Sequence, residues 1–257
     1  MSVMAAAILT AVGLFGGVLI LLEVGRRIGV RRAASDGDTA RAGTGAVEGA
    51  VFGLMGLLIA FTFTGAASRF DARRGLATEE ANDVGTAWLR LDLVPTAAQP
   101  ALRDSFRRYL DTRIEVYRLL PDVDASEAAM LRANALQGEI WALAVAACRE
   151  APPTTSSLLL PALNAMFDIT TTRTRASQVH PPLVVFGMLV VLTLVGALFA
   201  GFDMSAAKSR SWVHMLGFAF VMAAGVYIIL DFEYPRLGLI RLQSSDRVLI
   251  ELRQSMN

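Results

Sequence analysis

The feature that most constrains this chain is a run of twenty residues, 49–68, without a charged side chain. An α-helix rises about 1.5 Å per residue, so the run would be about 30 Å long, the thickness of the hydrocarbon core of a bilayer. Helices in soluble proteins rarely extend so far without a charge. The sequence therefore predicts a membrane-spanning helix here, which we place over residues 45–68.

Three other segments have the same character. Residues 3–22 and 183–202 carry no charge, and residues 212–230 carry Trp212 and Tyr227 near their ends, as interfacial anchors do. The N-terminal run is too long for a signal peptide and lacks a basic n-region, so we expect it to be retained as a span. Only 18% of the residues are charged, against about 25% in an average soluble protein. The chain is thus predicted to cross a membrane four times, as two helical hairpins.

The segment between the hairpins is of a different kind. Charged residues are mixed through it, apolar residues recur at helical spacing, and prolines punctuate it. These signals predict four helices, over residues 69–94, 100–120, 124–150 and 154–179. We expect Asp124 or Ser126 to cap the third helix and Pro161 to lie within the fourth. The predicted fold class is an all-α membrane protein in which two transmembrane hairpins flank an extramembrane helical bundle. The expected domains are 1–68, 69–182, 183–232 and an amphipathic tail, 233–257.

The short loops predict the orientation in the membrane. The loop after the first span contains five arginines, and the loop after the third contains Lys208 and Arg210. Positive loops stay in the cytoplasm, so the bundle and both termini would lie in the periplasm of a bacterium.

The second span has two distinctive faces. Small residues at helical spacing form one face, which we expect to pack closely against another helix of this subunit or of a neighbour: Gly45, Gly49, Gly53, Gly56 and Ala60. The other face mixes a carboxylate, bulky apolar groups and a hydroxyl, and it is our candidate pore lining: Glu48, Phe52, Met55, Ile59, Thr62 and Phe63. Alternatively, Glu48 is simply solvated among headgroups, and the aromatic residues face lipid or pack between helices.

Charged residues near this span suggest two further sites. Glu79, Glu80 and Asp83 either line a vestibule that attracts cations or form an ordinary solvated helix face. Spans two and four would end on the same side of the membrane, where charges of both signs are expected to pair: Arg69, Asp71, Arg73, Asp231, Glu233 and Arg236.

Little in the sequence suggests other chemistry. The chain has one cysteine and two histidines, without the spacing of a metal site, so we expect no metal and no other cofactor. It contains no GxSxG, SxxK or P-loop motif, so we do not expect an enzyme. The net charge of +1 gives no reason to expect nucleic-acid binding.

Several segments resemble a bacterial membrane family known as bestrophin-like. The resemblance covers residues 45–238 and is carried by LMGLLIAFTFTGAASRFDARRGL, EEANDVGTAWLRLDLVP, LPALNAMFDITTTR, HPPL and DFEYPRLGLIRL. True bestrophins, which are more distantly similar, are homopentameric ion channels with four spans per subunit and a helical domain between spans two and three. Their inserted domain is cytoplasmic, whereas the loop arginines of this chain predict the opposite side.

These observations lead to two hypotheses. In the first, the chain forms a homo-oligomeric ion channel of the bacterial inner membrane, with span two lining the axis and ions passing through; the resemblance to bestrophins implies a pentamer. In the second, it is a non-conducting scaffold or sensor whose helical domain binds a partner. Transport of small substrates ranks last, because the two hairpins show no similarity that would indicate inverted repeats.

Overall fold

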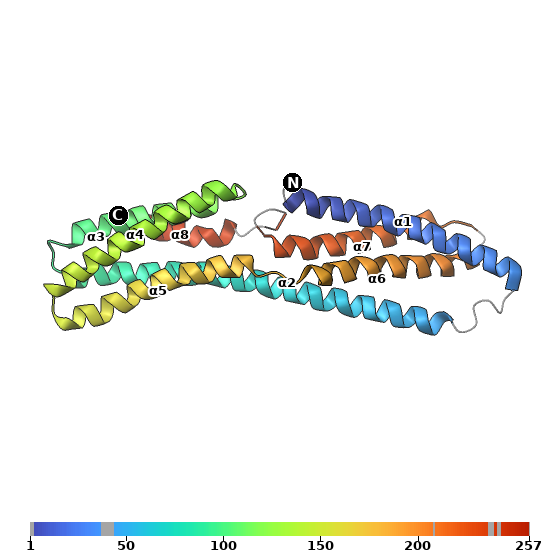
Figure 1. Ribbon diagram of the computed structural model, residues 1–257, viewed down its shortest axis with the longest axis horizontal. Helices are drawn as coiled ribbons and strands as arrows, with labels where there is room; N and C mark the ends of the chain where they lie inside the picture. Colours follow the sequence, from blue (N-terminus) through green and yellow to red (C-terminus); the bar gives the residue numbers. More distant parts are fainter. Residues whose placement is uncertain (1–2, 37–43, 208, 236–238, 241–242, 257) are drawn as a thin grey trace. The chain divides into compact units, whose positions relative to one another are not determined.

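The computed structural model describes residues 3–36, 44–207, 209–235, 239–240 and 243–256 (Figure 1). The helices are α1 (Val3–Asp36), α2 (Thr44–Leu89), η2 (Arg90–Leu93), α3 (Gln99–Arg118), α4 (Val123–Arg149), α5 (Pro153–Gln178), α6 (Leu183–Asp203), η3 (Met204–Ala206), α7 (Trp212–Glu233) and α8 (Gln243–Ser255). Within these described ranges there is no strand, and four helices are long and apolar enough to cross a membrane. The predicted fold class is confirmed.

The chain divides into two compact units, and α2 contributes to both. The membrane unit comprises residues 1–68 and 180–239, and the bundle unit comprises residues 69–179 and 240–257. The second range of the bundle unit brings in α8, so the tail that we expected to be separate from residue 233 onward joins the helical bundle from residue 240. Its Leu249 and Met256 lie in the bundle core, and the Arg107 guanidinium donates a hydrogen bond of 2.7 Å to the Met256 carbonyl.

In the membrane unit, α1 is longer than predicted. The residues after Leu22 were expected to form a loop, but the helix continues to Asp36. Charged side chains one turn apart neutralise one another on the helix surface, since Arg26 and Arg27 pair with Glu23 at 3.3 and 2.8 Å. These pairs are compatible with helix, which is why a run of arginines was a poor signal for a loop.

Glycines bring α1 and α6 into close contact. A Cβ atom at Gly25 would lie 2.0 Å from the Leu198 carbonyl oxygen, and one at Gly201 would lie 2.1 Å from the Leu22 carbonyl oxygen. The backbones of the two helices therefore touch, as small residues permit in lipid. Further along the crossing, Leu14, Val18 and Ala197 pack with Met215 and Ala219 of α7.

The bundle unit is a conventional helical core. Phe106, Tyr109, Leu110, Ile140 and Leu163 are fully buried. The residue that caps α4 was predicted wrongly, because Asp122 rather than Asp124 or Ser126 precedes the helix, and its carboxylate accepts a hydrogen bond of 3.1 Å from the Ala125 backbone amide. Helix α5 runs through Pro161 as expected.

Candidate functional site

The membrane half of α2 buries the face that we predicted to line a pore. Glu48, Met55 and Thr62 are each less than one-tenth exposed. A Cβ atom added to Gly196 of α6 would meet Met55 at 3.2 Å and the Phe52 ring at 3.4 Å, so this face packs on the same subunit.

Two further residues of the predicted lining, Ile59 and Phe63, differ in how far they are buried. Ile59 is half-buried and packs against the cluster of Ala66, Leu189 and Ile229. Phe63 is 42% exposed, with its ring edge-on to Phe232 at a centroid distance of 5.6 Å.

Most of the predicted lining is withdrawn from the surface of the single chain, and its place at a pore stays a prediction. A side chain that lines a passage between copies is exposed in the isolated subunit. Phe52 and Met55 instead approach Gly196 of α6, Ile59 packs with Leu189 of α6 and Ile229 of α7, and Glu48 and Thr62 are buried. Of the six, Phe63 alone is exposed.

The small-residue face of α2 is the outward one. A Cβ atom added at Gly45, Gly49, Gly53 or Gly56 would meet no described atom within 4 Å, and Ala60 is exposed. No helix within the described residues packs closely on this face. The expectation of close packing therefore remains a prediction about a neighbouring subunit.

In the bundle half of α2, the exposed positions are mostly polar. Thr78, Glu79, Asn82 and Thr86 are exposed, whereas Asp83 is half-buried. Partial burial, followed by the charges of Glu79 and Glu80, raises the pKa of Asp83 above its ordinary value.

Glu80 lies inside the bundle, contrary to its expected place on an acidic face. Its carboxylate is fully buried and accepts a hydrogen bond of 2.6 Å from Arg113 Nε, a second from Arg173 Nη1, and one of 3.0 Å from the Tyr117 hydroxyl. Arg173 in turn pairs with Asp246 of α8 at 2.9 Å.

This network controls the ionisation of Glu80. Burial by itself raises the pKa of the carboxyl group, but the charges and hydrogen bonds of Arg113 and Arg173 outweigh that effect and lower it below 4.5. The carboxylate is ionised and neutralised internally. Its charge therefore serves the packing of four helices rather than the attraction of ions.

The charged residues expected at the membrane edge make several local contacts. Arg73 donates hydrogen bonds of 3.0 Å to the Ala176 and Val179 carbonyls at the end of α5. Asp71 pairs with Arg74 at 3.6 Å.

Two of the three acidic members of this predicted group, Asp231 and Glu233, lie at the end of α7. The Leu239 backbone N–H donates a bifurcated hydrogen bond to both carboxylate oxygens of Asp231, each at 3.1 Å. Glu233 lies 3.4 Å from Nδ1 of His180, whose ring stacks on Tyr234. Arg236 lies outside the described residues, and the pairing of these acids with the arginines, including the half-buried Arg69, stays a prediction.

The arrangement defines the class of protein: an all-helical membrane protein with four candidate spans and, in the sequence, a helical bundle between the second and the third. The model of the Bestrophin-like domain family matches residues 12–246. The chain therefore belongs to the Bestrophin-like family.

Two solved structures, both variants of a bacterial bestrophin homologue from Klebsiella pneumoniae, share this fold. The first has 14% sequence identity and a TM-score of 0.62, covering 100% of this chain and 97% of that chain. The second has 14% identity and a TM-score of 0.60, covering 92% and 98%. No curated protein matches the sequence.

Proposed function

We propose that this protein is a homo-oligomeric ion channel of the bacterial inner membrane, in which α2 faces the axis of the ring. Membership of the Bestrophin-like family supports a membrane ion channel at the level of the family, and it favours self-association. The finer features of the proposal, which are the ring, the lining and the permeant ions, are inferred from the surface of α2.

One observation carries the proposal: a stripe of small residues runs along the exposed side of α2 in the membrane unit, beside the exposed side chains of Leu54, Leu57 and Phe61. A glycine face gives no packing advantage against lipid tails. It does give one against a second helix, because the two backbones can then approach each other closely. One flank of α2 already packs on α6, so the glycine face is left for neighbouring copies. A single subunit with four spans encloses little polar surface, so conduction requires such a ring.

We place the lining on the exposed side chains beside the glycines, which include Phe63. Bulky apolar side chains at a constriction oppose ion entry by dewetting. Phe63→Ala is therefore expected to raise single-channel conductance in planar bilayers. Phe220→Ala is the matched control, because Phe220 is an exposed phenylalanine of α7, where no lining is proposed. Equal conductance changes in both variants would contradict the assignment to α2.

The polar positions of α2 in the bundle unit are proposed to line a vestibule. Glu79 and Asp83 would draw cations toward the passage by their field. Glu79→Gln is expected to lower cation current at low ionic strength and to have little effect at high salt, because salt screens exposed charge.

The first experiment is to count subunits in membrane-extracted particles and to record from the same preparation. A closed ring with an axial hole and a current supports the channel. A monomer or dimer without current overturns it and favours the non-conducting scaffold. Gly53→Leu is expected to dissociate the ring without unfolding the subunit, since Gly53 has open space around it. Gly187→Leu, at an equally open glycine of α6, is the control.

Two arguments for sidedness disagree, and a cysteine test separates them. The loop arginines favour a periplasmic bundle, whereas the topology of bestrophins favours a cytoplasmic one. Cys148 is the sole cysteine, so a Cys148→Ser chain with Leu131→Cys carries one thiol at an exposed bundle position. We propose the periplasmic side. Labelling in intact spheroplasts by a membrane-impermeant reagent supports it, and labelling only after lysis contradicts it.

A further inference from the structure

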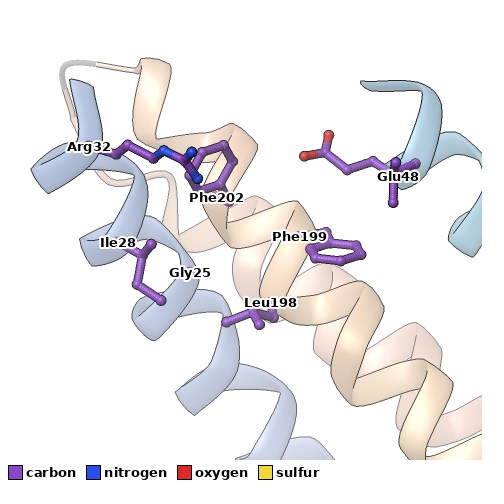
Figure 2. Close-up of a pocket in the computed structure, with 8 residues that line it drawn as sticks. Gly25, Ile28, Arg32, Glu48, Leu198, Phe199 and Phe202 are labelled. Atoms are coloured by element: carbon purple, nitrogen blue, oxygen red, sulfur yellow. The ribbon is translucent and has the colours of Figure 1, made fainter. Parts of the chain in front are cut away.

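A partly open cavity of about 340 Å³ lies in the membrane unit where three helices approach one another (Figure 2). Its walls are Gly25, Ile28 and Arg32 of α1, Val47 and Glu48 of α2, and Leu198, Phe199 and Phe202 of α6. The tight contact of α1 with α6 at Gly25 closes one side. Nothing in the channel proposal uses this cavity.

The cavity lies at the level where the spans end. Its α6 residues belong to the last two turns of that helix, which ends at Asp203, and its α2 residues immediately precede the uncharged run that begins at Gly49. The α1 residues lie beyond Leu22, where charges first appear. A cavity in this position meets phospholipid headgroups and the upper part of their acyl chains.

Two opposite charges border an otherwise apolar space. The Glu48 carboxylate extends from α2 toward the cavity, and the Arg32 guanidinium lies beside Phe202 on its other side (Figure 2). The residue Glu48 is only 7% exposed, so this carboxylate is largely withdrawn from water. The side chains of Ile28, Leu198 and Phe199 supply apolar parts of the wall.

This pattern selects for a particular chemistry. A purely anionic headgroup gains from Arg32 but is repelled by Glu48, and a purely cationic ligand meets the reverse. A ligand that carries both charges and an apolar tail can interact favourably with Arg32, with Glu48 and with the apolar wall of the cavity. Guanidinium binds phosphate through two parallel hydrogen bonds, and a buried carboxylate forms its strongest hydrogen bonds with an ammonium that carries N–H donors.

We propose that this cavity binds one phosphatidylethanolamine molecule per subunit. Arg32 holds its phosphate, Glu48 accepts hydrogen bonds from its ammonium group, and an acyl chain lies along Phe199 and Phe202. Phosphatidylcholine fits less well because its trimethylammonium group has no N–H donor. Phosphatidylglycerol fits less well because it brings no cation to Glu48. The proposal depends on the membrane location of the chain and not on conduction.

Native mass spectrometry of the full chain in detergent tests the proposal. Phosphatidylethanolamine, phosphatidylcholine and phosphatidylglycerol with identical acyl chains are titrated in parallel. We expect the first to occupy one site per subunit with about tenfold higher affinity than the other two, the effect of one charge-assisted hydrogen bond. Equal retention of the three lipids by the unaltered chain would overturn the proposal, and this comparison needs no variant.

Matched variants then locate the site. Glu48→Gln and Arg32→Gln are each expected to lower retention of phosphatidylethanolamine about tenfold. Arg31→Gln, one position away on α1 and outside the cavity, and Glu79→Gln, in the bundle, remove the same charges and should leave retention unchanged. If the two controls reduce retention as much as the cavity variants, the binding is general electrostatic attraction and the site is refuted.

Soluble phosphoethanolamine separates a lipid from its free headgroup. We expect no retention at concentrations that saturate the site with the lipid, because the apolar wall then contributes nothing. Comparable binding of the soluble compound would show a headgroup-sized ligand and would overturn the lipid assignment.

Discussion

Replacing Glu80 by glutamine should destabilise the bundle unit more than a typical loss of a charge. The carboxylate and its partner Arg113 are both completely buried, and Arg173 is nearly so. Glutamine keeps the shape of the side chain but leaves two guanidinium groups without their shared anion. Breaking a buried pair from one side costs about 3–5 kcal/mol, since the remaining charge is desolvated without compensation.

The assay is thermal or denaturant unfolding of the full chain in detergent, followed by tryptophan fluorescence. Trp88 reports on the relevant transition because it belongs to the same bundle core. A loss of this size corresponds to a fall of roughly 10–20 °C in melting temperature for a unit of this length. Glu139→Gln is the matched control. Glu139 pairs with Arg108 at the surface, where both side chains are more than two-fifths exposed, so its loss should cost less than about 1 kcal/mol.

A double-mutant cycle adds a second criterion. If Glu80 and Arg113 interact as described, Glu80→Gln combined with Arg113→Gln will destabilise less than the sum of the single variants, because the second change removes the charge that the first left unpaired. The reasoning is refuted if Glu80→Gln and Glu139→Gln have the same small effect. Such a result would mean that water compensates the arginines inside the bundle.

Three further predictions follow from individual contacts. The lowered pKa of Glu80 contributes stability above its ordinary value of 4.5, so the free energy of unfolding should fall as pH decreases below 4.5, and Glu80→Gln should flatten that dependence. Gly201→Ala should destabilise the membrane unit, because the new Cβ atom would lie 2.1 Å from the Leu22 carbonyl oxygen; Gly187→Ala, at an open position, should not, and melting temperatures in detergent compare the two. Asp122→Ala removes the N-cap of α4 and should cost about 1 kcal/mol in a denaturant titration, and no loss would show that the cap is solvated without cost.

The order of helices could be predicted from the sequence because its signals are local. Uncharged runs of span length require a helix in lipid, where each backbone group must be satisfied internally. Proline ends or begins helices wherever it removes an amide donor, which places the boundary near Pro95 and the starts of α3 and α5 correctly. The predicted end of α1 was wrong, because a basic segment with an acidic residue one turn away is as compatible with a helix as with a loop.

Burial of individual side chains was harder to predict. Glu80 stands beside Glu79 in the sequence and looks equally solvated, yet its environment is set by Arg113 and Arg173, which lie 33 and 93 residues further along the chain. An acidic residue flanked by helical apolar positions, such as Ala77 and Val84, was the available signal. It indicates an inward face but not the partners that neutralise the charge.

The two faces of α2 show the same limit in the membrane. Helical periodicity separates a small-residue face from a bulky one but does not say which faces its own subunit. In water the bulkier face would turn inward by the hydrophobic effect, whereas lipid is as apolar as leucine and supplies no such preference. The outcome depends on the shape of the partner: Gly196 leaves room on α6 for Met55 and Phe52. The glycines of α2 are consequently turned outward, and a second backbone that approaches them gains packing that acyl chains do not supply. Dissociation by Gly53→Leu with an intact subunit fold therefore tests this direction of packing independently of any current.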